Sequence, residues 1–146
     1  MSQFAAEIAL IRKRFGTLFE DVHGPTSAVP VLVLYDNSPN GTPGVEKPYV
    51  RLKVDFVDSM LAGLGSPRLF RDIGLTIIQV FVPQGSGEEL LLSLMDEVAD
   101  IFFAKTVVDG PTEMVFDKPK GQRVGPEGPY YQGNITVKYR SDFTAP

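Results

Sequence analysis

The chain has 146 residues, no cysteine and a formal net charge of −4 at pH 7. This length is typical of one domain, and it suffices to bury a core without disulfide staples. The lack of cysteine excludes disulfides, thiolate chemistry and cysteine-ligated metals. The acidic balance argues against sequence-specific nucleic-acid binding through a basic face, and no apolar run approaches the roughly 20 residues of a membrane span. We therefore expect a single domain over residues 1–146 that contacts no membrane.

The N-terminal segment predicts an amphipathic helix. Its apolar residues recur at spacings of three and four, which forms one stripe, and Glu7 with three basic residues lies largely off that stripe. The stripe consists of Phe4, Ile8, Ile11, Phe15 and Leu18. His23, the only histidine, follows in a connector over residues 21–27. We expect it at the surface, because a catalytic histidine needs positioned partners.

The next segments predict two strands separated by a long loop. Residues 29–35 have the composition of a buried strand, and residues 36–47 are rich in proline, glycine and asparagine. Residues 48–56 alternate between apolar and mostly charged side chains, as in a half-buried antiparallel strand. Residues 57–70 contain two glycines and a proline, so a loop is expected there.

Residues 74–82 form the most apolar strand-like run of the chain. Both faces are apolar, which predicts a central strand, or an edge strand that becomes covered when subunits meet. The second face is expected to be covered by loops or by a neighbouring subunit. Pro83 ends the strand because proline has no backbone N–H. Ser86 and Glu89 have the spacing of a capping box, which predicts a helix to about Ala104. Its expected inner face consists of Leu91, Leu94, Met95, Val98, Ile101 and Phe102.

The C-terminal part predicts two more strands. A connector over residues 106–112 precedes a short strand at 113–117, and residues 118–128 form a second long loop that is basic in its first half. Residues 130–140 alternate as a final strand, and residues 141–146 are expected to fray. The order is α-β-β-β-α-β-β. We predict an α+β fold with a mainly antiparallel sheet of about five strands and two amphipathic helices on one face.

No segment carries a recognisable catalytic or ligand-binding motif. Ser86 lies between two glycines ahead of a predicted helix, but no Walker lysine follows, and a helix-capping role accounts for the serine. Asp96, Glu97 and Asp100 are expected to form a solvated acidic helix face. We expect no enzyme, no catalytic residue, no cofactor and no metal. A small-molecule-binding α+β domain is the alternative, and it would need an apolar pocket with convergent polar groups.

Several segments match, in their order, those of a known family. They are the N-terminal helix, Tyr35-Asp36-Asn37, Pro48-Tyr49-Val50-Arg51-Leu52, Arg71-Asp72-Ile73-Gly74, Ile78-Gln79-Val80-Phe81-Val82-Pro83, Gly85-Ser86-Gly87, Ile101-Phe102 and Tyr130-Tyr131-Gln132-Gly133-Asn134. This succession resembles the phage tail terminator-like family. The resemblance implies a structural virion protein without catalytic residues. Such a protein is assembled in the bacterial cytoplasm and caps the head-proximal end of the tail tube as a homohexameric ring, ending polymerisation and joining tail to head.

The implied partners are further copies of the chain, the tail tube protein and the head–neck connector, with DNA passing through the ring. Both long loops, 36–47 and 118–128, are expected to contact these partners. Candidate interface residues are Asn37, Asn40, Arg51, Arg71, Lys118, Lys120 and Arg123. Arg51 and Arg71 match family positions at the sheet edge, and an ordinary surface salt bridge is an equal alternative for both. A phage neck or head-completion ring protein is the alternative function.

Overall fold

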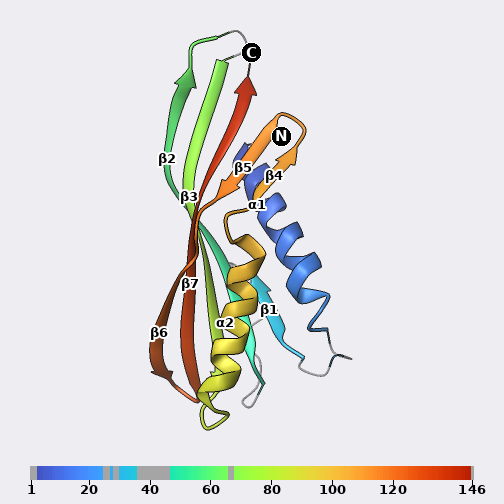
Figure 1. The fold of residues 1–146 in the computed structure, drawn as a ribbon, viewed down its shortest axis with the longest axis vertical. Coiled ribbons are helices and arrows are strands. Elements are labelled where there is room, and N and C mark those ends of the chain that lie inside the picture. The colour runs from blue at the N-terminus through green and yellow to red at the C-terminus, as the bar shows by residue number, and fades with distance from the viewer. Residues whose placement is uncertain (1–2, 25–26, 28–29, 36–46, 66–67, 146) are drawn as a thin grey trace.

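The computed structural model describes residues 3–24, 27, 30–35, 47–65 and 68–145. The described elements, in chain order, are α1 (Gln3–Phe15), the π-helix η1 (Gly16–Glu20), β1 (Leu32–Tyr35), β2 (Tyr49–Gly63), β3 (Arg68–Pro83), α2 (Glu88–Phe102), β4 (Thr106–Asp109), β5 (Thr112–Phe116), β6 (Lys120–Glu127) and β7 (Tyr130–Ala145). Both α-helices lie on the same face of one long, curled sheet (Figure 1). The predicted α+β class and helix placement are confirmed. The predicted strand number and order are wrong, because the sheet has seven strands in the described chain.

The sheet is built around β3. Its strand order is β1-β2-β3-β7-β5-β4, and β6 also pairs with β7. β1 runs parallel to β2, and the other pairs are antiparallel. The central position of β3 confirms the prediction for residues 74–82. Between residues 74 and 82, the β3 side chains on the helix side are buried, whereas Leu75 and Ile77 on the opposite side are half-buried. The described part of the chain thus covers the second face only partly.

The core lies between the helices and the sheet. All six residues predicted for the inner face of α2 are buried, and they share one cluster with Val80, Ile135 and Val137 of the sheet. Burying a side chain of this size stabilises the fold by about 1.5–3 kcal/mol. Gly133 of β7 permits close approach, because a Cβ there would lie 2.5 Å from the Met95 sulfur. The prediction for this helix face is confirmed.

The N-terminal helix is turned relative to its predicted stripe. Ile11 and Phe15 are buried as expected, but Phe4 and Leu18 are exposed and Phe19 is buried instead. The π-helix after Phe15 has a wider turn than an α-helix, which changes the residue that faces the core. Glu7, expected off the stripe, is 0% exposed. It accepts a hydrogen bond from the Tyr139 hydroxyl at 3.2 Å, which partly compensates its burial.

Two segments predicted to be loops are strands. Residues 57–70 belong mostly to β2 and β3, which pair out to Gly63 and Leu69 with register shifts after Phe56 and Leu61. Residues 118–128 contain β6, which pairs with Tyr130–Thr136 of β7. Both predictions were wrong because glycines are accommodated at register shifts, Gly63 in β2 and Gly125 in β6, and Pro126 pairs within β6 without breaking the strand.

The last two predicted irregular segments also join the sheet. The connector 106–112 contains β4, which forms a hairpin with β5. The C-terminal segment expected to fray continues β7, where Ser141–Ala145 pair with Arg68–Asp72 of β3. Backbone pairing overrides the weak local signal in both places, with the next strand for β4 and with a strand distant in the sequence for the end of β7.

The capping box at Ser86 is also not formed. The Ser86 hydroxyl donates a hydrogen bond of 2.6 Å to the Pro83 carbonyl oxygen, and the N-cap of α2 is Gly87, without a side-chain cap. Gly87 has φ 96° and ψ 152°, a conformation that other residues rarely adopt. The chain thus enters α2 through a glycine turn.

The predicted loop 36–47 lies outside the described residues except for Lys47.

Candidate interaction surfaces

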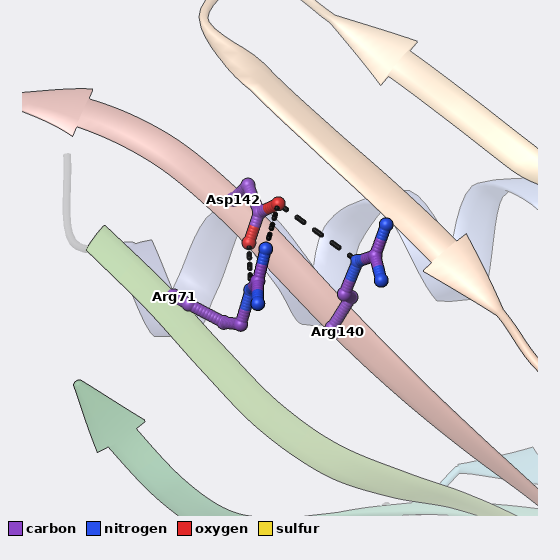
Figure 2. A network of polar contacts seen from close by, with 3 residues as sticks. All are labelled: Arg71, Arg140 and Asp142. Carbon is purple, nitrogen blue, oxygen red and sulfur yellow. Dashed lines mark hydrogen bonds and ion pairs between the residues drawn. The ribbon is translucent and has the colours of Figure 1, made fainter. Parts of the chain in front are cut away.

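The structure separates the predicted interface residues. Asn37 and Asn40 lie outside the described residues. Arg71 lies on the central strand β3 and not at a sheet edge, which corrects the prediction. It forms a two-pronged contact with Asp142 of β7, with Nε 2.7 Å from Oδ1 and Nη2 3.0 Å from Oδ2 (Figure 2). Nε of Arg140 lies 3.8 Å from the same carboxylate.

This charge pair joins two neighbouring strands of one chain. The hydrogen bond from Arg71 lowers the pKa of the Asp142 carboxyl group against the opposing effect of burial, and it raises the pKa of the guanidinium. Planar two-pronged contacts of this kind fix geometry as well as energy. Within the described chain, Arg71 therefore forms the salt bridge that was the alternative to an interface role.

Arg51 lies on β2 between β1 and β3, and so it is not at a sheet edge either. Lys120 lies opposite Thr136 of β7, on the side of the sheet that carries no helix. Arg123 lies on the other side, where its guanidinium forms an ion pair with Glu88 at the start of α2. Lys118 precedes β6 and is exposed. The basic stretch therefore divides between two faces of the molecule.

The helix-free side of the sheet, which we call the bare face, carries an apolar stripe whose rim is mostly basic. The stripe consists of Ile73, Leu75 and Ile77, which are half-buried residues on β3. On the two neighbouring strands, basic residues lie directly opposite Gln79 or a residue of the stripe. They are Arg51 and Lys53 on β2 and Lys138 and Arg140 on β7. Two acidic residues of β2 belong to the same rim, Asp55 opposite Leu75 and Asp58 opposite Ile73.

On the opposite side of the molecule, the outward surface of α2 is acidic, and we call it the acidic helix face. The helix contains no basic residue, and its Leu92 is 42% exposed among the acids. The acidic residues are Glu88, Glu89, Asp96, Glu97 and Asp100. This face confirms the expectation that Asp96, Glu97 and Asp100 are solvated.

His23 was predicted at the surface, but it is buried in the structure. It is 8% exposed, and its Nε2 lies 2.5 Å from Oε2 of Glu97 on α2. Its ring also contacts Phe19, with centroids 4.6 Å apart. The residue thus ties the segment after η1 to α2. Sequence reasoning missed it because Glu97 follows 74 residues later.

The end of the β2–β3 hairpin, which we call the arm, carries a further exposed apolar surface. Val57, Met60 and Leu61 are exposed there, and Leu64 in the turn is 86% exposed. Figure 1 shows this hairpin projecting beyond both helices at one end of the molecule. Exposed apolar side chains gathered in one place are typical of surfaces that contact another protein.

Chemically reactive arrangements are lacking in the described part of the chain. Among those residues, no group of three or more histidine, cysteine, aspartate or glutamate side chains is placed to hold a metal ion. The described helices include none that is both long and apolar enough to cross a membrane. The buried Glu7–Tyr139 contact is internal, and burial followed by the Glu7 charge raises the pKa of Tyr139.

These features define a small α+β protein with exposed faces suited to contacts with other proteins. In a comparison with protein families, residues 8–139 match the phage tail terminator protein family, and the chain belongs to that family. It therefore has a structural role in a phage tail and is a component of the virion tail, and the family's structural nature indicates a protein that is not an enzyme.

Among solved structures, 21 chains are similar to this protein, which supports the fold described above. One of them, which carries no descriptive name, is 20% identical in sequence, with a TM-score of 0.69. The match covers 100% of this chain and 99% of the other. No curated protein matches the sequence.

Proposed function

We propose that the protein caps the head-proximal end of the tail tube as a homohexameric ring, ends tube polymerisation and joins the tail to the head–neck connector. The observation that carries this proposal is the family match over residues 8–139. In this role the protein assembles in the bacterial cytoplasm without a cofactor, and DNA passes through the ring. Its partners are copies of itself, the tail tube protein and the connector.

The shape of the molecule supports this role. A ring that sits between tube and connector needs one contact surface at each end, and the arm lies at one end of the long axis (Figure 1). The turns that follow β3 and β6 lie at the other end (Figure 1). The ring itself needs two further, mutually complementary surfaces on each subunit, because a head-to-tail contact uses different patches on its two sides.

The test is a phage that lacks this protein, complemented or not by a plasmid-borne copy. Without the protein, we expect electron micrographs to show overlong tails or tails that fail to join heads, and complementation should restore joined tails of normal length. Purified protein should form hexamers in native mass spectrometry and should bind tube ends. Joined tails of normal length in its absence contradict the proposal. Normal tail length together with binding to head portals identifies a neck protein instead.

A further inference from the structure

The bare face and the acidic helix face lie on opposite sides of the same sheet. α2 packs on the sheet through Leu91 and Met95, which approach Gly133. On β3, residues alternate between the two sides, and Ile78 and Val80 lie in the core beneath the helices. The stripe at Ile73, Leu75 and Ile77 therefore points away from both helices. A sheet face of this kind is usually packed against another layer. In the described chain no helix covers it.

The acidic helix face and the mostly basic rim of the bare face are complementary in charge. On the acidic helix face, Glu89, Asp96 and Asp100 take part in none of the ion pairs of the described chain. On the bare face, the same is true of Arg51 and Lys138. Each face also places apolar side chains within its charged rim: Leu92 on the helix and the stripe on β3.

We propose that, within the ring of the proposed function, the acidic helix face of one subunit packs on the bare face of the next. This inference rests on that function and specifies its subunit contact. Leu92 then covers part of the stripe, and Asp96 and Asp100 approach the basic rim. Because the two faces are different and lie on opposite sides, the contact is head-to-tail, which is the kind that closes into a ring.

The apolar stripe favours a protein occupant over DNA. Phosphate groups gain nothing from contact with Ile73, Leu75 or Ile77, whereas an exposed leucine on a helix does. The chain itself carries the matching helix, so a second copy meets both requirements of the face. Complementary potentials of this kind also suppress wrong pairings, because like charges brought together cost several kcal/mol.

Two charge-reversal variants test the contact. Variant one, Asp96→Lys with Asp100→Lys, makes the helix face positive; variant two, Arg51→Glu with Lys138→Glu, makes the bare face negative. Each variant alone brings like charges together, so we expect its association to weaken by at least about a hundredfold. Mixed in equal amounts, the two variants restore opposite charges at every contact. Native mass spectrometry should then show rings in which the variants alternate.

The matched control is Asp109→Lys, an exposed reversal at the end of β4, away from both faces. It should form rings like the unaltered protein, and circular dichroism should show that all the variants are folded. Rings from either reversal variant alone, or no rings from the mixture, overturn this contact while leaving the proposed function intact. If unaltered protein forms no ring even with tube ends present, the proposed function fails and takes the contact with it. DNA binding that variant two abolishes assigns the bare face to DNA and also overturns the contact.

Discussion

At the scale of single residues, the Arg71–Asp142 pair gives the protein a defined response to acid. The contact with Arg71 lowers the pKa of Asp142 below its ordinary value of 3.8. A carboxyl group with a lowered native pKa stabilises the fold above its unfolded pKa, and this stabilisation is lost as the pH falls through the native value. The pair should therefore stabilise the protein at neutral pH and contribute progressively less below about pH 4.

The variant Asp142→Asn tests this response. At pH 7 it should lower the melting temperature, because Arg71 then faces a neutral group. The difference from the unaltered protein should shrink as the pH is lowered below 4. Melting curves by circular dichroism from pH 2 to pH 7 measure it. A difference that stays constant over this range would show that the substitution acts through packing and not through the carboxylate charge.

Ser86 and Gly87 form a matched pair of positions at the start of α2. The Ser86 hydroxyl bonds to the Pro83 carbonyl and caps no helix N–H, so Ser86→Ala should cost less than about 0.5 kcal/mol. Gly87 has φ 96°, so Gly87→Ala should cost about 1–3 kcal/mol through backbone strain. Urea denaturation of both variants measures the two costs. If Ser86→Ala proves the more costly, the serine caps the helix after all.

At the scale of elements, the C-terminal strand carries a clear prediction. Truncation after Arg140 removes the part of β7 that pairs with β3 at Arg68–Asp72 and with β5 at Thr112–Met114. It also removes the buried Ser141 and the partner of Arg71. We expect the truncated protein to melt at a markedly lower temperature or to fail to fold. An unchanged melting temperature would show that this segment is a frayed tail, as its sequence predicts.

The sequence predicts elements better where the signal is local. The inner face of α2 follows from a 3.6-residue period, and all six of its residues are buried as predicted. The start of β3 and the end of β7 pair residues far apart, such as Arg68 with Ala145, and no local pattern encodes such a partner. β6 pairs with the next strand, and it was missed for a different reason: its two glycines and its proline are typical of a loop.

At the scale of the whole molecule, the sequence shows which residues are charged but does not predict the face on which each of them lies. Lys120 and Arg123 are three positions apart in one basic stretch, yet they project from opposite sides of the sheet. Arg51 and Lys138 are far apart in the chain, yet both border one apolar stripe. The faces arise from the strand order, so they become visible only when β2, β3 and β7 are placed side by side.

The apolar residues of the arm contribute little to the stability of the fold, because they are exposed. Leu64 and Met60 are exposed, so Met60→Ser with Leu64→Ser should change the free energy of unfolding by no more than about 0.5 kcal/mol. If the arm contacts the tube or the connector, the same variant should impair tail joining in the complementation test. The control is Val108→Ser, which is also exposed but lies on β4, the strand at the other edge of the sheet. It should restore joined tails of normal length. Normal joining with the arm variant would make the arm ordinary surface and would move the contact with the tube or connector to the opposite end of the molecule.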